Sequence, residues 1–174
     1  MAFERSPAGK WDYSAVAEPV AYGTIESYEK AAAWLNDCDL VEDRGCGTGF
    51  ARQFIKGGYR GVDGSPSKWT EVVVDLLKYS HPVPGILLRH VLEHNVKWPM
   101  ILQNAVTDFQ HRLAIVIHIP LCKTTDRYLD PTVFPTGNVP NIQMCKYDFM
   151  VEIAPFLERM EVLSTGEILF CLER

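Results

Sequence analysis

A cluster of glycines in the first third of the chain is the strongest sign of chemistry in this sequence. Residues 43–49 have the sequence D-R-G-C-G-T-G, and they follow the apolar pair Leu40-Val41. Glycines at alternate positions let the backbone turn sharply and lie flat against a ligand, because no side chain stands in the way. A strand, a glycine-rich turn and the start of a helix together form a cofactor cradle. The residues predicted to line this cradle are Asp43, Gly45, Cys46, Gly47, Thr48 and Gly49.

The spacing of these glycines bears on the kind of cofactor. Dinucleotide-binding proteins need G-x-G-x-x-G, in which the third glycine lies where the helix meets the strand. Counting from Gly45, the sixth position is Phe50, and the third glycine comes one residue early. A nicotinamide-dependent oxidoreductase is therefore a disfavoured alternative.

Polar residues stand where several predicted strands end. Asp43 ends the first strand, Asp63 the second, Asp75 the third, and Arg89-His90 the fourth. In an open parallel sheet, ligands bind beyond the carboxyl ends of the strands. We therefore expect these side chains to share one site.

Three segments, taken in order, resemble the class I S-adenosylmethionine-dependent methyltransferases. The pattern D-x-G-x-G-x-G at 43–49 resembles motif I of that family. The segment G-V-D-G-S-P at 61–66 resembles its G-h-D-x-S-P segment, where h is apolar, and R-H-V-L-E-H at 89–94 resembles the h-L-E-H segment of small-molecule methyltransferases. The resemblance extends from about residue 22 to the C-terminus and is strongest over residues 40–94.

This resemblance implies S-adenosylmethionine as cofactor and assigns roles to single residues. Asp43 would orient the glycine loop and the methionine end of the cofactor. Asp63 would accept hydrogen bonds from the ribose hydroxyls, and charge-assisted bonds of this kind are strong. Asp75 and the backbone of Leu76 would recognise adenine. The other residues assigned to the cofactor site are Gly64, Ser65, Arg89 and His90.

The implied reaction is transfer of a methyl group to a small-molecule or glycan-linked acceptor, on oxygen or nitrogen. Where the acceptor must lose a proton, a histidine is suited to remove it near neutral pH. His90 and His94 are the predicted catalytic residues, and His118 is a further candidate base. A carboxylate, thiolate or neutral amine acceptor needs no base.

Two alternatives come from the same residues. His90-x-x-Glu93-His94 also matches the H-x-x-E-H pattern of one group of zinc proteases. Such a motif needs a long amphipathic helix, whereas here it follows a strand-like run, so no metal site is predicted. The second alternative is a non-catalytic protein that binds S-adenosylmethionine, or a partner subunit, because Arg44 stands where the family carries an apolar residue. A charge in a buried strand must be paired, so Arg44 is expected to pair with an acid or to contact substrate.

Hydrophobic periodicity predicts the elements that position these residues. Helices are expected over 22–36, 50–56 and 96–109, and partly over 143–157; strands are expected over 40–43, 59–63, 72–74, 86–89 and 113–119, followed by a hairpin of 160–164 with 168–172. The alternation predicts an α/β fold. Five strands and the hairpin make a seven-stranded, mostly parallel sheet with helices on both faces and a C-terminal antiparallel hairpin, which matches the class I methyltransferase fold.

Residues 1–174 are expected to form one such domain. Residues 1–20 are predicted to be a flexible N-terminal segment, whose aromatic side chains together with Tyr22 and Tyr28 are placed to close over a cofactor. Residues 120–141 are predicted to be a lid or substrate loop, because loops of this length in compact domains are usually functional. Within this loop, acceptor recognition is expected at Asp126, Arg127, Tyr128 and Phe134.

Composition excludes several classes of protein. The net charge is −5 and the 17 basic residues are scattered, which does not suit a binder of nucleic acid. The chain also lacks the Asn-Pro-Pro-Tyr or Asp-Pro-Pro-Tyr segment of DNA amino-methyltransferases. Five widely spaced cysteines without a C-x-x-C pair indicate free thiols in a reducing compartment. No apolar run approaches a membrane span, so a cytoplasmic protein without a membrane partner is expected.

Overall fold

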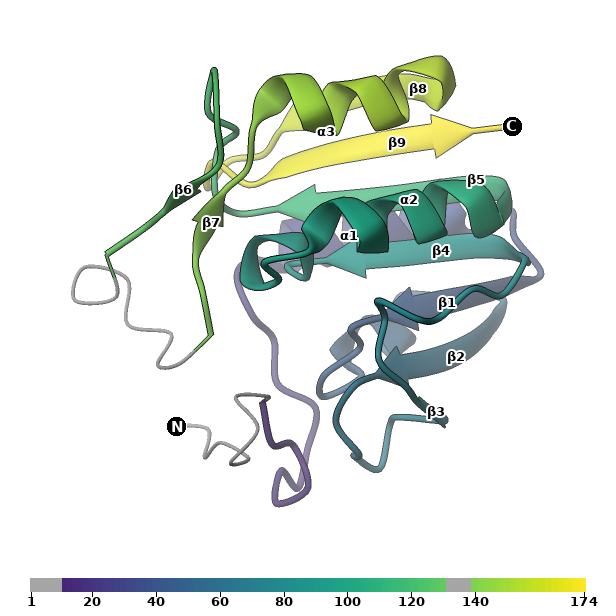
Figure 1. Ribbon diagram of the computed structural model, residues 1–174. Helices are drawn as coiled ribbons and strands as arrows, with labels where there is room; N and C mark the ends of the chain where they lie inside the picture. The colour runs from purple at the N-terminus through teal and green to yellow at the C-terminus, as the bar shows by residue number, and fades with distance from the viewer. Residues whose placement is uncertain (1–10, 131–138) are drawn as a thin grey trace.

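The computed structural model describes residues 11–130 and 139–174. A seven-stranded sheet runs through the described part of the chain, with the order β3-β2-β1-β4-β5-β9-β8 (Figure 1). Its strands are β1 (Leu40–Arg44), β2 (Gly58–Asp63), β3 (Val72–Val73), β4 (Val83–Arg89), β5 (Phe109–Ile117), β8 (Leu157–Val162) and β9 (Ile168–Glu173). The α-helices are α1 (Ile25–Leu35), α2 (Trp98–Asp108) and α3 (Lys146–Ile153), and short 3-10 helices are η1 (Phe50–Gln53), η2 (Leu92–His94) and η3 (Ala154–Phe156).

The strand order explains where a ligand site can form. Strands β1 to β5 pair in parallel, whereas β9 is antiparallel to both β5 and β8. The chain builds outward from β1 to β3 and then crosses over to β4 on the other side of β1. Ligands of open α/β sheets bind at such a switch point, outside the carboxyl ends of the strands. The predicted α/β fold with a C-terminal antiparallel hairpin is confirmed.

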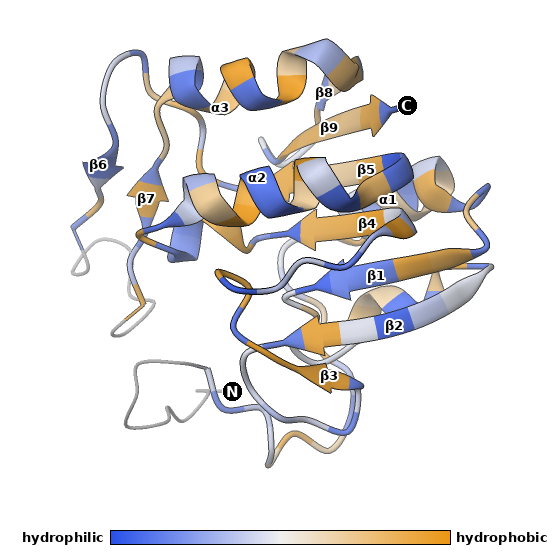
Figure 2. Ribbon diagram, turned by 45° about the vertical axis from the view of Figure 1, so that its right-hand side comes forward, coloured by the Kyte–Doolittle hydropathy of each residue, from blue (hydrophilic) through white to orange (hydrophobic). Residues whose placement is uncertain are grey.

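Helices cover both faces of the sheet, because the central parallel strands carry apolar side chains on both faces. On one face, Ile86 and Leu88 of β4 pack with residues of α2 and α3. On the other face, Leu87 of β4 packs with Leu35 of α1. Figure 2 shows β4 mostly orange, whereas β1 changes from orange to blue toward its carboxyl end, where the polar residues of the site begin.

One predicted helix is wrong in extent, and one partly helical segment is confirmed. The segment expected as a helix over 50–56 forms only the 3-10 helix η1, Phe50–Gln53. Its aromatic side chains Phe50 and Phe54 pack against Tyr28 of α1, with ring centroids 5.0 and 5.8 Å from the Tyr28 ring. The partly helical segment expected over 143–157 contains α3 and η3, and the chain before it forms β7 (Ile142–Gln143).

The predicted loop over 120–141 contains a strand. Arg127–Tyr128 forms β6, which pairs with β7 in a small antiparallel sheet beside the main one (Figure 1). Cys122 forms a parallel bridge with Cys145, so the start of this segment is anchored to the residue before α3. Residues 131–138, which include Phe134, lie outside the described residues, as do residues 1–10 of the predicted N-terminal segment. Within the described ranges, no helix has the length and apolar character to cross a membrane.

Candidate functional site

A cavity of about 610 Å³ lies at the carboxyl ends of β1 and β4. A smaller cavity of about 180 Å³ adjoins it toward the carboxyl ends of β2 and β3. The residues that line both are Trp11, Tyr13, Gly45, His90 and His94. The two cavities therefore form one crevice that crosses the glycine loop, and ligand pockets commonly have volumes of about 300–1,000 Å³.

The glycine loop has a backbone that other residues adopt poorly. Gly45, Gly47 and Gly49 have φ angles of 88°, 51° and 66°. A Cβ atom on Gly45 would lie 2.3 Å from Cγ2 of Val91, so this glycine is required for packing. For Gly47, which lines the larger cavity, the three atoms nearest to an added Cβ all belong to Tyr13, at 3.3 Å or more. Gly49 lines neither cavity; its Cβ would lie 2.5 Å from Cβ of Trp69.

Asp63 ties the glycine loop to the loop that follows β2. One carboxylate oxygen accepts a hydrogen bond from the Gly47 backbone N–H at 2.9 Å, and the other accepts one from the Ser65 N–H at 2.8 Å. Asp63, Gly64, Ser65, Asp75 and Leu76 all line the smaller cavity. The two loops therefore place this group of predicted residues together, as the sequence suggested.

Asp43 is a buried acid at the floor of the larger cavity. It is 4% exposed, and one carboxylate oxygen accepts a hydrogen bond from the Tyr59 hydroxyl at 2.7 Å. Burial raises the pKa of Asp43 to about 6, although the Tyr59 hydrogen bond and the positive charge of Arg89 oppose this shift. The carboxyl group therefore titrates within reach of neutral pH.

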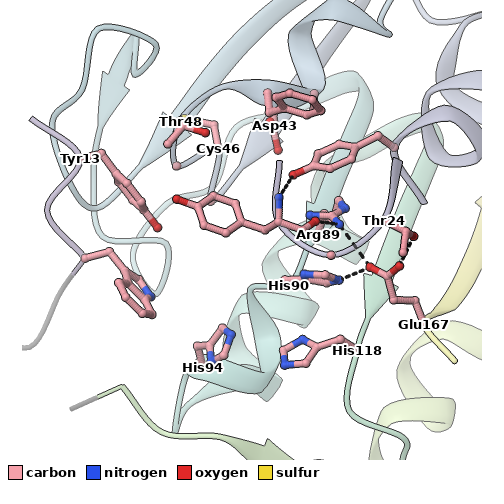
Figure 3. Close-up of a pocket in the computed structure, with 18 of the residues that line it drawn as sticks. Tyr13, Thr24, Asp43, Cys46, Thr48, Arg89, His90, His94, His118 and Glu167 are labelled. Atoms are coloured by element: carbon pink, nitrogen blue, oxygen red, sulfur yellow. Dashed lines mark hydrogen bonds and ion pairs between the residues drawn. The ribbon is translucent and has the colours of Figure 1, made fainter. Parts of the chain in front are cut away.

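Glu167 holds together the groups on the far wall of the larger cavity, a role that no sequence pattern indicated. It follows the β8–β9 turn, and its carboxylate contacts Arg89 Nη2 at 3.2 Å and His90 Nε2 at 2.7 Å. The Thr24 hydroxyl also donates to it. Burial alone would raise the pKa of Glu167, but the hydrogen bonds from His90 and Thr24 hold that pKa at about 2. Figure 3 shows Arg89, His90 and Thr24 converging on this carboxylate.

Arg89 is fixed in place by several neighbours. Its guanidinium lies 3.6 Å from the centroid of the Tyr28 ring. Nε and Nη2 donate to the Ser27 hydroxyl, and Nη2 also donates to the Tyr22 carbonyl. Nη1 donates none of these bonds, so it is the part of the guanidinium that remains for a ligand in the cavity.

Three imidazoles from three elements meet at one side of the crevice. The ring centroids of His90 and His118 are 4.7 Å apart, and those of His94 and His118 are 5.3 Å apart (Figure 3). His90 has a φ of 54°, a strained value for a residue with a side chain. Burial lowers the pKa of both His90 and His94. Burial therefore favours the neutral form of both imidazoles.

The N-terminal segment runs along the crevice. The Ser65 hydroxyl donates to the Trp11 carbonyl, and Thr48 Oγ1 bonds both the N–H and the carbonyl of Val20 at 3.0 Å. Tyr13 points into the cavity from this segment (Figure 3). Residues 11–20 therefore form one wall of the crevice without being helix or strand.

Other predicted positions lie elsewhere. Asp126 accepts hydrogen bonds from the Trp98 indole and the Cys145 N–H, and neither it nor Arg127 nor Tyr128 lines the crevice. The H-x-x-E-H histidines do not share a helical face, because His90 precedes the short 3-10 helix that contains His94. Across residues 11–130 and 139–174, no group of three histidine, cysteine or acidic side chains is arranged to hold a metal ion.

Comparisons with known proteins show the fold. No family model and no curated protein matches the sequence. Among solved structures, the magnesium protoporphyrin IX methyltransferase from Synechocystis PCC 6803 with bound SAH (S-adenosylhomocysteine) superposes with a TM-score of 0.62 at 18% identity, covering 86% of this chain and 82% of that one. The 1,6-didemethyltoxoflavin-N1-methyltransferase of Burkholderia thailandensis, crystallised with S-adenosylhomocysteine, gives 0.59 at 13% identity, covering 85% and 78%.

The mitomycin 7-O-methyltransferase gives a TM-score of 0.58 at 15% identity, covering 86% of this chain and 53% of that larger one. The chain thus has the fold of the class I S-adenosylmethionine-dependent methyltransferases. Because the names of these neighbours differ in the atom that is methylated, the shared fold does not identify the acceptor.

Proposed function

We propose that this protein is an S-adenosylmethionine-dependent methyltransferase that acts on a small-molecule or glycan-linked acceptor. The observation that carries the proposal is the continuous crevice at the strand switch point, which has Asp43 at one end and Asp63 and Asp75 at the other. The glycine loop forms the floor between them. The solved structures with the same fold, crystallised with SAM or S-adenosylhomocysteine, support this assignment.

The residues present fit the cofactor at each of its parts. Asp75 and Leu76 would hold adenine, and Asp63 would receive the ribose hydroxyls, in the smaller cavity. In the larger cavity, Asp43 would attract the positive charge of the methionine portion, and Arg89 Nη1 would meet its carboxylate. Gly47 has no side chain that would fill the part of the crevice beside the glycine loop. When bound, S-adenosylmethionine supplies an electrophilic methyl group on a sulfonium sulfur.

Calorimetry is the first test of this function. We expect S-adenosylmethionine and S-adenosylhomocysteine to bind, and NAD and Zn²⁺ not to bind. Turnover with a panel of hydroxyl and amine metabolites, followed by release of S-adenosylhomocysteine, then distinguishes an enzyme from a non-catalytic binder. Failure of both nucleosides to bind would overturn the proposal.

The replacement Asp63→Ala tests the ribose contact. We expect binding of S-adenosylmethionine to weaken by about 1–3 kcal/mol, because a buried charged hydrogen-bond partner is lost. Calorimetry measures the affinity, and circular dichroism checks that the loops it ties still fold. Asp39→Ala, an exposed acid at the opposite edge of the sheet, is the control and should leave affinity unchanged. Equal affinity in the two variants would refute the role of Asp63.

The pKa of Asp43 predicts how cofactor affinity depends on pH. A positively charged ligand favours the ionised carboxylate, whose pKa is raised to about 6 by burial. Affinity for S-adenosylmethionine should therefore rise as pH increases from 5 to 7 and level off above. Calorimetry at four pH values measures this curve. In Asp43→Asn, affinity should be weak and nearly flat over the same range; a curve that keeps the wild-type shape would assign the titration to another group.

A further inference from the structure

One wall of the crevice is not accounted for by the cofactor. It consists of the imidazoles of His90, His94 and His118, with the carboxylate of Glu93 behind them. The contacts of the three histidines differ, and the differences bear on which of them can take a proton from an acceptor.

Glu93 and His118 form a buried carboxylate–imidazole pair. Glu93 is 0% exposed, and its Oε1 accepts hydrogen bonds from the backbone N–H of His118 at 2.7 Å and from its Nδ1 at 2.8 Å. Burial alone would raise the pKa of Glu93, but the His118 hydrogen bond and the neighbouring imidazoles hold it at about 2. The carboxylate form of Glu93 is therefore favoured, beside the imidazole of His118.

This pairing fixes which nitrogen of His118 faces a ligand. Because Nδ1 donates to Glu93, Nε2 carries the lone pair in the neutral ring. The His118 side chain is 34% exposed and lines the larger cavity, so an acceptor can reach it. A carboxylate at Nδ1 also stabilises the imidazolium that forms when Nε2 takes a proton.

The other two histidines lack this combination. Nε2 of His90 lies 2.7 Å from Glu167, and that carboxylate is shared with Arg89. His94 Nδ1 contacts the Pro140 carbonyl at 3.0 Å, which fixes a tautomer but supplies no full negative charge to an imidazolium. The sequence favoured His90 and His94 as catalytic residues, whereas these contacts favour His118.

We propose that His118, positioned by Glu93, is the general base of the methyl transfer, and that the acceptor is therefore a hydroxyl compound, specifically a phenol. This inference rests on the proposed methyltransferase function. In the step, the acceptor oxygen forms a bond to the methyl carbon while the carbon–sulfur bond breaks and its electron pair goes to sulfur. The hydroxyl proton passes to His118 Nε2 and from there to water.

The class of acceptor follows from the need for a base. A carboxylate, a thiolate or a neutral amine has a free electron pair at neutral pH, so a buried carboxylate–imidazole pair would add nothing to its reaction. A hydroxyl group becomes a strong nucleophile only as its proton leaves. The indole of Trp11 and the phenol ring of Tyr13 line the same crevice as the imidazoles, and flat walls of this kind suit an aromatic ring.

Two phenols of similar shape but different acidity test the base. At pH 8, 4-nitrophenol is mostly ionised, whereas 4-methylphenol keeps its proton. His118→Gln should lower methylation of 4-methylphenol by about a hundredfold or more, which is the usual contribution of a general base, and should change methylation of 4-nitrophenol only a few-fold. Glu93→Gln should show the same selectivity. His111→Gln, near the amino end of β5, the strand that His118 directly follows, is the matched control and should leave both rates unchanged.

An equilibrium measurement tests the same pair without turnover. 4-Nitrophenol bound to the S-adenosylhomocysteine complex, at a pH below its own pKa, should absorb as the yellow phenolate in the wild type. It should absorb as the neutral phenol in His118→Gln.

The outcomes separate this inference from the function on which it rests. Equal loss of both methylation rates in His118→Gln would overturn the base role. If the protein binds S-adenosylmethionine but methylates neither phenol, the acceptor class is overturned and the cofactor assignment stays intact. The same holds if it binds S-adenosylmethionine but does not bind 4-nitrophenol. Failure to bind the nucleosides would overturn both.

Discussion

Replacing Gly47 with valine is expected to abolish binding of S-adenosylmethionine while the protein stays folded. Gly47 lines the larger cavity, and the three atoms nearest to its missing Cβ all belong to the Tyr13 ring, at 3.3 Å or more. An isopropyl group there would occupy the floor over which the nucleoside must pass. A positive φ of 51° adds a backbone cost of roughly 1–2 kcal/mol for a residue with a side chain, which a domain of ordinary stability can absorb. Calorimetry and thermal unfolding measure the two effects separately.

Two other glycines serve as comparisons for this variant. Gly166→Val carries a similar strain, at a φ of 86°, but has nothing within 4 Å of its Cβ position, so it should lose comparable stability and keep its affinity. Gly45→Ala should instead lower stability strongly, because its Cβ would meet Val91 at 2.3 Å. Retained affinity in a folded Gly47→Val protein would mean that the cofactor does not cross this loop.

The position of the site was predictable because parallel strands place their carboxyl ends together. Asp43, Asp63 and Asp75 are far apart in the sequence, yet each follows or ends a strand, and the topology of alternating strands and helices puts such ends at one edge. The glycine loop was predictable for a similar reason, since closely spaced glycines allow few other conformations. Short patterns of this kind contain the information locally.

The extent of the elements was less predictable, because side-chain and strand contacts decided it. The sequence places the fourth strand at 86–89, after a turn that contains two prolines, but β4 begins at Val83 and includes Pro84. The pairing of β4 with β5 shifts register between Val83 and Gly85, which leaves Pro84 at an irregular position where the missing N–H is tolerated. The short η1 has a comparable cause, since its phenylalanines pack against α1.

The contacts that distinguish the histidines could not be predicted at all. Glu167 reaches Arg89 and His90 across a separation of 78 and 77 residues, from a turn that looks like an ordinary hairpin tip. Glu93 and His118 are 25 residues apart and belong to different elements. No spacing rule links such pairs, and only the sheet order β4-β5-β9 brings them together.

Arg44 is the departure from the family pattern that the structure explains, and the expectation that it pairs with an acid is confirmed. Its side chain is 2% exposed and contacts Glu42 Oε2 at 3.0 Å and Asp108 Oδ2 at 2.8 Å. It also donates to the carbonyl of His81. Arg44 lines neither cavity, so its departure from the family pattern does not by itself argue for a non-catalytic protein.

Replacing Arg44 with methionine is expected to lower the free energy of unfolding by about 3–5 kcal/mol, since removing one partner of a buried ion pair leaves the other charge uncompensated. Here two carboxylates, Glu42 and Asp108, would remain buried. Glu42 would keep its ion pair with the partly exposed Arg60 and its hydrogen bond from Tyr79, whereas Asp108 would keep only hydrogen bonds, from Ser80 and the His81 N–H. Denaturant titration measures the loss. Lys30→Met removes a cation from a solvent-exposed pair and should cost much less, because water already screens that pair.

Neutralising the two acids as well decides whether charge or packing explains the loss. The triple variant Glu42→Gln, Arg44→Met, Asp108→Asn removes all three charges of this buried cluster. Replacing a whole buried ion pair by uncharged side chains often changes the free energy of unfolding little. We therefore expect the triple variant to be more stable than Arg44→Met alone. If the triple variant is as unstable as Arg44→Met or less stable, two other contacts of Arg44 matter more than charge compensation. The Arg44 guanidinium stacks over the Tyr79 ring, 5.0 Å from its centroid, and it donates a hydrogen bond to the His81 carbonyl. In either case binding of S-adenosylmethionine by the folded fraction should be unchanged, because this cluster lies on the face of β1 opposite Asp43.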